Sequence, residues 1–289
     1  MDVSILGLGL MGGSMCERLL EVGLRPRVFD VDGAKVSRLA SLGAEACATA
    51  EGLAGGDVLL VSLPNDAVVE SAIVSSGLLA HLRGRVLVEL STILPPTMER
   101  VASAAAEHDV AIVDCPVSGG PAEARAGTLT QLVGASDEAW ARAEPVLVHL
   151  GTAERVGRPG QGKAIKLVNN VMAMGNMVVA AEAFALGEKL GLDASRMFDV
   201  LSRSGGRSHH FLKRMPFVLE RDFTARFALA MGEKDLRLAL QMAHEAGYVM
   251  PATSTVHQMY EVGRARGLEA EDIAAIVKVY EEWGGVDTG

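Results

Sequence analysis

Short apolar runs alternate with helix-like segments over the first half of the chain. The runs with strand character are Val3–Leu8, Arg27–Asp30, Val58–Leu63, Val86–Leu90 and Ala111–Val113. A segment with the helical spacing of apolar positions follows each run, and this rhythm predicts βαβ units with a parallel sheet. Because the runs are almost continuously apolar, we expect helices to cover both faces of that sheet.

After Gly162 the strand signals stop and helical periodicity takes over. The predicted helices are Ala164–Leu190, Ala194–Ser202, Leu229–Ala246, Thr253–Arg266 and Glu271–Glu281. Gly191, Gly247 and Gly267 stand just beyond three of them, where a left-handed C-terminal cap favours glycine. A segment rich in glycine and proline, 158–162, separates the two patterns. We therefore predict an α/β fold with a doubly wound sheet at residues 1–161 and an all-helical domain at residues 162–289.

Composition narrows the class of protein. A chain of 289 residues with 49% hydrophobic and 22% charged residues is typical of two soluble globular domains. The formal charge of −9 and the absence of basic clusters exclude nucleic acid as an expected partner. Cys16, Cys47 and Cys115 are odd in number and widely spaced, which indicates a reducing, cytoplasmic location rather than disulfides or structural zinc.

Neither the apolar residues at the N-terminus nor the long apolar segment in the middle of the chain predicts a membrane protein. No basic segment precedes the first apolar residues, so we expect a first strand there and not a signal peptide. The apolar segment 167–186 contains Asn169, Asn170, Asn176 and Glu182, which are expensive in hydrocarbon. We expect a helix buried in protein, and no membrane partner.

A glycine-rich loop follows the first predicted strand and opens a helix. Its residues are Gly7, Leu8, Gly9, Leu10, Met11 and Gly12. In the Gly-x-Gly-x-x-Gly arrangement the first glycine permits a tight turn, the second lets the backbone approach a pyrophosphate, and the third permits close helix–sheet packing. The helix N-terminus then offers amides to the phosphates. The sequence predicts a Rossmann-type dinucleotide site, with a merely structural turn as the alternative.

Asp30 ends the second predicted strand, where an acidic residue can accept hydrogen bonds from the adenosine ribose hydroxyls. A carboxylate at this position repels a ribose 2′-phosphate, and Val31-Asp32-Gly33 supplies no cation to compensate. We therefore favour NAD over NADP as the cofactor, with NADP possible. The alternative is that Asp30 only caps the turn that follows.

Two further loops should line the same crevice, because they follow the next strands at the carboxyl edge of the sheet. Leu63, Pro64 and Asn65 follow one strand and Thr92 follows the other. We predict cofactor contacts here, although Asn65 and Thr92 also suit helix caps.

Two segments carry candidate chemistry. Ser118, Gly119 and Gly120 offer a hydroxyl and backbone amides that can hold a carboxylate, or form an ordinary turn. Lys166 and Asn170 are four residues apart on an apolar helix and share one face. Burial would lower the pKa of a lysine and let it act as a general base, whereas a lysine that reaches solvent would have no such role.

Other kinds of catalytic site find little support. His209 and His210 are adjacent and point in different directions, and His244 and His257 are too far apart to share a helix face. No metal-ligand cluster emerges, and no Gly-x-Ser-x-Gly elbow is present.

These motifs, in this order, resemble the 3-hydroxyisobutyrate dehydrogenase-like, or β-hydroxyacid dehydrogenase, family, which is related to the 6-phosphogluconate dehydrogenases. The resemblance covers nearly the whole chain. Its carriers are the segments 5–12, 91–93, 114–120, 162–170 and Lys234-Asp235-Leu236.

The resemblance implies a role for each segment. Lys166 looks like the catalytic acid–base, Asn170 like a partner that orients the substrate, and the 118–120 loop like the anchor of the substrate carboxylate. Lys234 resembles the lysine that reaches the cofactor, and residues 63–65 with Thr92 resemble nicotinamide-side contacts. The implied reaction transfers hydride between NAD(P) and a small β-hydroxy acid or its semialdehyde, of the 3-hydroxyisobutyrate or tartronate semialdehyde class. In relatives the long helix 164–190 is part of a subunit interface, so the resemblance also implies a homodimer or homotetramer.

Two features depart from the family pattern, namely residues 121–125 and the polar stretch Arg203–His210. Arg125, Arg207 and His209 could contact a second anionic group or simply be solvated. The alternatives to a hydroxyacid dehydrogenase are an imine reductase-like enzyme and a non-catalytic dinucleotide-binding scaffold. Relatives of both kinds tend to lack the lysine, so Lys166 argues against them.

Overall fold

The computed structural model describes residues 1–286, which form two compact units. The first unit is Met1–Lys166, and the second begins at Leu167. Helix α8 (Gln161–Lys189) passes through this division and therefore starts in the first unit. The boundary predicted between residues 161 and 162 falls in the first turn of α8, whereas the contacts divide the chain after Lys166.

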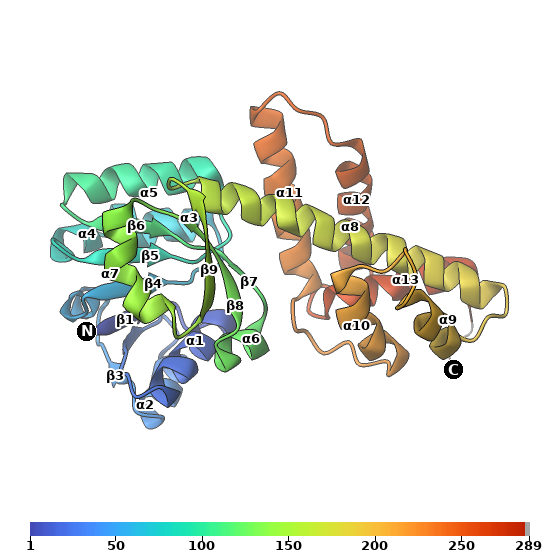
Figure 1. Cartoon of the computed structure of the whole chain (residues 1–289), viewed down its shortest axis with the longest axis horizontal. Helices are drawn as coiled ribbons and strands as arrows, with labels where there is room; N and C mark the ends of the chain where they lie inside the picture. The colour runs from blue at the N-terminus through green and yellow to red at the C-terminus, as the bar shows by residue number, and fades with distance from the viewer. Residues whose placement is uncertain (287–289) are drawn as a thin grey trace. The chain divides into compact units, whose positions relative to one another are not determined.

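A sheet forms the centre of the first unit (Figure 1), with nine strands in the described part of the chain. Its parallel part consists of β1 (Val3–Leu6), β2 (Arg27–Phe29), β3 (Glu45–Ala46), β4 (Val58–Val61), β5 (Val86–Glu89) and β6 (Ala111–Asp114). Their order in space is β3-β2-β1-β4-β5-β6, so the strand order reverses between β1 and β4. This arrangement confirms the predicted doubly wound, Rossmann-type sheet, in which ligands bind at the carboxyl ends beside the reversal.

Helices cover both faces of the sheet, as the apolar runs predicted. They are α1 (Leu10–Glu21), α2 (Gly33–Ser41), α3 (Asp66–Val69), α4 (Leu78–His81), α5 (Pro95–Glu107), α6 (Pro121–Ala126) and α7 (Asp137–Leu147), with a 3₁₀ helix η1 (Ala50–Gly55) and a π-helix η2 (Glu70–Ser75). In β4, Val58 and Leu60 join the apolar cluster that includes α1, whereas Leu59 and Val61 join the cluster that includes α5. Figure 1 shows α1 and α5 on opposite sides of the sheet.

Three further strands extend the sheet beyond β6, and the apolar pattern does not predict them. They are β7 (Val117–Ser118), β8 (Leu129–Gly134) and β9 (Gly151–Gly157). β8 pairs antiparallel with β6 and β7, whereas β9 pairs parallel with β8. β9 is an edge strand whose residues are exposed or half-buried, so it lacks the continuous apolar run that identified the other strands.

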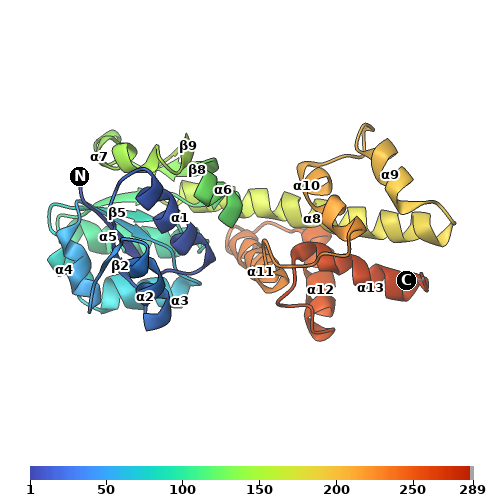
Figure 2. The ribbon, with the colours of Figure 1, turned by 90° about the horizontal axis from the view of Figure 1, so that it is seen from below.

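Helices and their connecting segments make up the described part of the second unit (Figure 2). Beside α8, they are α9 (Ala194–Leu201), α10 (His209–Leu219), α11 (Leu229–Glu245), α12 (Pro251–Ala265), η3 (Ile273–Ile276) and α13 (Val277–Gly284). Gly191, Gly247 and Gly267 have φ angles of 80°, 67° and 76°, which confirms the three predicted left-handed caps.

The helix α10 is absent from the sequence-based expectation, because the polar stretch at residues 203–210 obscures its start. Ser208 caps it, with its side chain accepting a hydrogen bond from the Phe211 amide. Phe211, Met215 and Val218 then pack into the core of the second unit.

The long helix α8 has one buried and one exposed apolar face. By length and composition it is the one helix among residues 1–286 that could cross a membrane, and 44% of its apolar window is buried. Met174 and Met177 lie in the core, whereas Met172, Val179 and Leu186 are 64%, 63% and 60% exposed. Beyond Lys166 the helix therefore packs in the second unit with a stripe of apolar side chains uncovered.

Candidate active site

The turn after β1 requires glycine at two positions. Gly7 has a φ of +88°, and its amide donates to the carbonyl of Phe29 in β2. A Cβ atom on Gly12 would lie 2.0 Å from the carbonyl oxygen of Gly7, so only glycine lets α1 start this close to β1. The backbone therefore forms the tight turn and close packing that the spacing predicted.

Gly9 has a different environment from the two packed glycines. A Cβ on Gly9 would meet no atom within 4 Å, so this backbone faces open space. Gly9 is the N-cap of α1, which has neither a side-chain cap nor an acidic residue in its first turn. Leu8 is buried, Leu10 is 70% exposed and Met11 is half-buried. An uncapped helix N-terminus beside an open glycine fits the pyrophosphate of a dinucleotide.

Asp30 lies directly beside this loop. Its Oδ2 accepts a 2.6 Å hydrogen bond from the Leu8 amide, and its Oδ1 accepts from the Asp32 amide at 2.8 Å. The carboxylate is thus held at the end of β2, where it can still accept from ribose hydroxyls. Lys35, which no motif in the sequence indicates, places Nζ 3.8 Å from Oδ1 of Asp30 and 3.6 Å from Oδ2 of Asp32.

The loops after β4 and β5 are joined by a hydrogen bond. The Leu63 amide donates to Oγ of Ser91 at 2.8 Å, next to Thr92, which is half-buried. Asn65 is exposed, as is Pro64, and its Oδ1 accepts from the Val68 amide as the N-cap of α3. The capping role of Asn65 is therefore present in the structure, and its cofactor contact stays a prediction.

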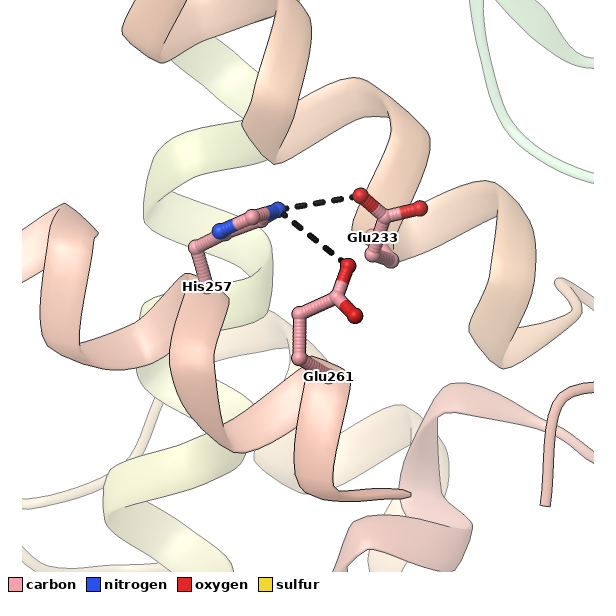
Figure 3. A group of neighbouring side chains, drawn as sticks. All are labelled: Glu233, His257 and Glu261. Carbon is pink, nitrogen blue, oxygen red and sulfur yellow. Dashed lines mark hydrogen bonds and ion pairs between the residues drawn. The ribbon is translucent and has the colours of Figure 1, made fainter. Parts of the chain in front are cut away.

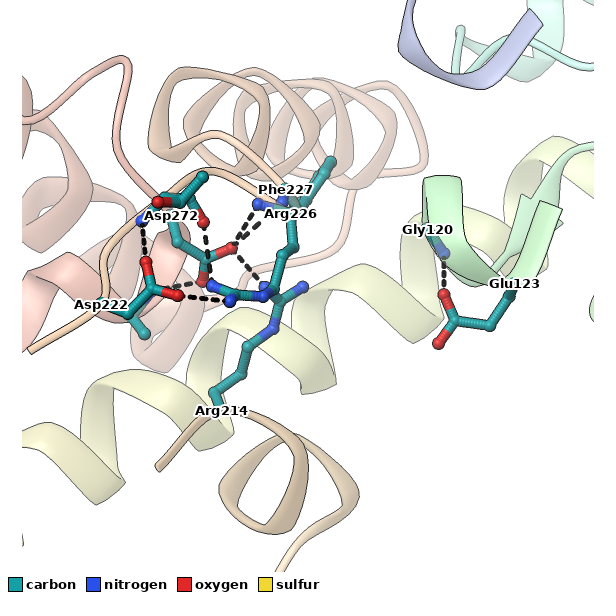
Figure 4. Close-up of polar contacts among 9 residues, drawn as sticks. Gly120, Glu123, Arg214, Asp222, Arg226, Phe227 and Asp272 are labelled. Carbon is teal, nitrogen blue, oxygen red and sulfur yellow. Dashed lines mark hydrogen bonds and ion pairs between the residues drawn. The ribbon is translucent and has the colours of Figure 1, made fainter. Parts of the chain in front are cut away.

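The loop at residues 118–120 has an acidic neighbour, Glu123, within the segment 121–125 that departs from the family pattern. Ser118 pairs with Thr130 of β8, and Gly119 adopts a φ of +129°. The Gly120 amide donates to Oε2 of Glu123 at 2.8 Å (Figure 4). One of the amides predicted to hold a substrate carboxylate thus already binds a carboxylate.

The fully buried lysine at the start of α8 is Lys163, whereas Lys166, for which the sequence left both burial and exposure open, lies between the two. Lys166 is half-buried, with Ile165 and Val168 beside it 42% and 52% exposed. Lys163 is fully buried, and its Nζ lies 2.6 Å from Oε2 of Glu89. Sequence periodicity could not separate the two lysines, because positions three apart share one helix face.

Asn170, one turn beyond Lys166 on α8, belongs to a polar cluster in the second unit. It is 4% exposed, and its Nδ2 donates to Oδ2 of Asp235 at 2.6 Å. Nζ of Lys234 lies 3.0 Å from Oδ1 of Asp235. The structure therefore brings two predicted residues, Asn170 and Lys234, together through Asp235, which the sequence marked only as part of the motif Lys234-Asp235-Leu236.

The residues suggested for a second anionic group have intramolecular contacts. Arg125 donates to Oγ of Ser14, which ties α6 to α1. Arg207 donates to the Ser202 carbonyl at 3.5 Å, and the His209 ring contacts the ring of His210 edge-on. Each of these three side chains therefore has a contact within its own unit, and binding of a second anionic group stays a prediction.

A group of potential metal ligands occurs on α11 and α12 (Figure 3). Atoms of Glu233, His257 and Glu261 lie within 4.8 Å of one another. Arg264 NH1 lies 3.2 Å from Oε2 of Glu233, and Nε2 of His257 lies 2.9 Å from Oε1. Arg264 thus supplies positive charge and His257 a hydrogen-bonding contact to Glu233, so the group reads as a polar network between the two helices.

A second network, centred on the buried Asp272, holds the chain ahead of α11 in place (Figure 4). The Asp272 carboxylate accepts hydrogen bonds from the Arg214 side chain and from the amides of Arg226 and Phe227. Arg226 also donates to Asp222 at 2.6 Å. These contacts stabilise the second unit.

Known families match both parts of the chain. Residues 2–175 match the NAD-binding domain of 6-phosphogluconate dehydrogenase, and residues 160–280 match the NAD-binding region of NADP-dependent 3-hydroxyisobutyrate dehydrogenase. The chain is 39% identical to 2-(hydroxymethyl)glutarate dehydrogenase of Eubacterium barkeri, over 98% of this chain and 96% of that protein. It is 35% identical to 3-hydroxyisobutyrate dehydrogenase of Pseudomonas aeruginosa, over 96% and 98%. The structure of Mycobacterium tuberculosis 3-hydroxyisobutyrate dehydrogenase with L-serine matches with a TM-score of 0.88 at 30% identity, covering 96% of this chain and 98% of that one.

Proposed function

The chain belongs to the 3-hydroxyisobutyrate dehydrogenase-like family of nicotinamide-dependent oxidoreductases, and we propose that it oxidises or forms a small β-hydroxy acid with Lys166 as the acid–base. The observation that carries the proposal is the combination, in the first unit, of an uncapped glycine loop at Gly9 with Lys166 at the start of α8. The loop fits a dinucleotide, and the lysine supplies a group that can exchange a proton.

We propose NAD as the preferred cofactor. Asp30 is fixed beside Leu8 by its hydrogen bond, so its negative charge stands where the adenosine ribose would bind. Val31 and Asp32 add no positive charge, and Lys35 is already within 4 Å of two carboxylates. This arrangement favours ribose hydroxyls over a 2′-phosphate.

The residues of the chain have separate tasks in the proposed reaction. When bound, the nicotinamide supplies the acceptor or donor of hydride. Nζ of Lys166 accepts the proton from the substrate hydroxyl during oxidation, and returns it to the developing alkoxide during reduction. Ser118 and the glycines after it orient the substrate carboxylate, and Asn170 assists from the next turn of α8. Placement and electrostatics are the contributions of the protein.

Lys166→Ala is the test of the assignment. We expect NADH affinity within about threefold of the wild type and a fall in kcat of about 10³-fold, the scale of general acid–base catalysis. Lys189→Ala, at the far end of the same helix, is the matched control and should keep wild-type rates. The assay is NADH absorbance with a panel of β-hydroxy acids and their semialdehydes. Wild-type kcat in Lys166→Ala would refute the role of the lysine.

The same assay separates the alternatives when cyclic imines are added to the panel. An imine reductase-like enzyme would reduce cyclic imines and leave the hydroxy acids unchanged, whereas a scaffold would bind NADH and turn over neither class. The presence of Lys166 favours the dehydrogenase over both.

We further propose that a second copy of the chain covers the exposed face of α8, as a homodimer or within a homotetramer. The stripe of Met172, Val179 and Leu186 supports this, because apolar side chains that are more than half exposed on one helix face gain from burial. Light scattering should give at least a dimer, and Val179→Arg should give a monomer. Val148→Arg, at a site of similar exposure in the first unit, should not change the mass.

A further inference from the structure

Three charged side chains are fully buried together at the carboxyl edge of the sheet in the first unit. They are Lys163 of α8, Glu89 at the end of β5 and Asp114 at the end of β6. Nζ of Lys163 lies 2.6 Å from Oε2 of Glu89 and 3.0 Å from Oδ1 of Asp114, and it donates to the Glu89 carbonyl at 2.8 Å. We call these three residues the buried triad.

A buried triad is a costly way to join a helix to a sheet. Apolar residues of the same volume often give equal or greater stability, because charges lose their hydration when they are buried. The proposed chemistry assigns none of the three residues a step. Their arrangement therefore needs an explanation other than stability alone.

The triad fixes the first turn of α8 by more than its charges. Oδ2 of Asp114 accepts hydrogen bonds from the amides of Gly160 and Lys163, at 2.8 and 3.2 Å. A Cβ on Gly162 would lie 2.8 Å from the same oxygen and 2.5 Å from the Leu132 carbonyl, so the helix start is pressed against the sheet. Both the position and the direction of this turn are thereby set.

Through Glu89, the triad is also linked to the loops predicted to contact the nicotinamide. Oε1 of Glu89 accepts from the Ser91 amide at 3.1 Å, and Oγ of Ser91 accepts from the Leu63 amide. Asp114 in turn begins the segment that leads to Ser118. One buried cluster thus joins the helix start that precedes Lys166 to three loops of the candidate site.

Lys163 is suited to a fixed role because it stays charged. Burial alone would lower its pKa, but the carboxylates of Glu89 and Asp114 raise it above the ordinary value. A lysine that keeps its proton cannot replace Lys166 as a base. It can hold two carboxylates in place through the catalytic cycle.

We propose that Lys163 is a positioning residue which, with Glu89 and Asp114, fixes the first turn of α8 and so sets the orientation of Lys166 one turn later. The proposal rests on the proposed function, because it assigns Lys163 a task only if Lys166 reacts. Positions 163 and 166 share a helix face, so a helix start anchored through the first directs the second toward the same edge of the sheet.

The kinetic test compares Lys163→Met, Lys163→Arg and Glu89→Gln with Arg214→Met. The last variant removes a buried ion pair of the second unit and serves as the control for loss of stability. Assays are run at a temperature well below each Tm. We expect Lys163→Met to lower kcat at least 30-fold, with NADH affinity within threefold and the pH profile of kcat displaced. Lys163→Arg should recover part of kcat, and Arg214→Met should keep kcat within threefold. Equal losses in Lys163→Met and Arg214→Met, or an unchanged pH profile, would overturn the proposal.

A second measurement does not depend on activity. The rate at which acetic anhydride modifies Lys166 is followed by peptide mass spectrometry, with Lys189 as the internal reference. We expect the ratio of the two rates to change at least threefold in Lys163→Met and in Glu89→Gln, the milder variant that keeps the fold if Lys163→Met does not. An unchanged ratio of the two modification rates would overturn the positioning role. Wild-type turnover in Lys166→Ala would instead refute the proposed function, and it would not affect the measured ratio.

Discussion

The Gly120 amide donates to the side chain of Glu123 at 2.8 Å, so a carboxylate of the protein lies at the loop expected to bind a carboxylate of the substrate. Glu123 is the third residue of α6, where its side chain caps the helix start. The loop therefore combines a structural cap with a local negative charge.

This charge should limit the binding of substrates with a second carboxylate. We predict that Glu123→Gln, which keeps an acceptor for the Gly120 amide, lowers the KM of dicarboxylic β-hydroxy acids about fivefold relative to that of monocarboxylic ones. The figure corresponds to about 1 kcal/mol of repulsion between partly exposed charges. Glu123→Ala should show the same change in KM and also lose about 1 kcal/mol of stability with the cap. Equal KM ratios in wild type and both variants would contradict the prediction.

The glycines of the phosphate loop should respond differently to the same substitution. Gly12→Ala places a Cβ 2.0 Å from the Gly7 carbonyl oxygen. We predict that this variant loses at least about 2 kcal/mol of unfolding free energy and also loses NADH binding. Gly9→Ala meets no atom within 4 Å, so urea unfolding should change by less than about 0.5 kcal/mol. Its NADH affinity should nevertheless fall more than tenfold, because the methyl group occupies the approach to the pyrophosphate. Intact NADH binding in Gly9→Ala would show that the dinucleotide does not lie there.

Cofactor choice should depend on the end of β2. We predict that the wild type has a higher kcat/KM with NAD than with NADP, and that Asp30→Ala combined with Val31→Arg reverses the order. The change removes a carboxylate and supplies a cation for the 2′-phosphate. Lys35→Ala is the control, with less than a threefold effect on NAD. A wild type that uses both cofactors equally would contradict the role of Asp30.

The cysteines should differ in reactivity. Burial raises the pKa of Cys16 and of Cys115 to about 12, and it also raises the pKa of the half-buried Cys47. A raised pKa leaves less thiolate below that pH, so all three should react slowly at pH 7 and faster as the pH increases. In the native protein, an aromatic disulfide reagent should modify about one thiol, that of Cys47. The other two thiols should react only after urea unfolds the protein. Fast modification of Cys115 in the native protein would be inconsistent with its burial.

Much of the fold could be predicted because its strands are short and apolar. Alternate residues of β4 enter two different cores, which requires a strand without polar positions, and the sequence shows this directly. β9 and α10 could not be predicted in the same way. The first is an edge strand with exposed positions, and the second begins in a polar segment where the Ser208 cap is one of several serines.

The motifs of the candidate site could be predicted from the sequence, but the contacts between residues far apart in the chain could not. Lys163 and Glu89 are 74 positions apart, and Glu233 and His257 are 24 apart, so no local spacing predicts either contact. Helical periodicity placed Lys163 and Lys166 on one face. Periodicity could not show which of the two lysines is buried against the carboxyl edge of the sheet, because that depends on the direction in which α8 leaves the sheet.

The buried triad also constrains how the gene can change. Replacing Lys163 leaves two buried carboxylates without their counterpart, a defect that typically costs about 3–5 kcal/mol, whereas replacing Glu89 or Asp114 leaves Lys163 paired with one carboxylate. A lineage could exchange the charges for apolar residues only through such an intermediate or by simultaneous substitutions. We therefore expect the three positions to be inherited together and to covary among close descendants of this sequence, even where the residues around the substrate diverge.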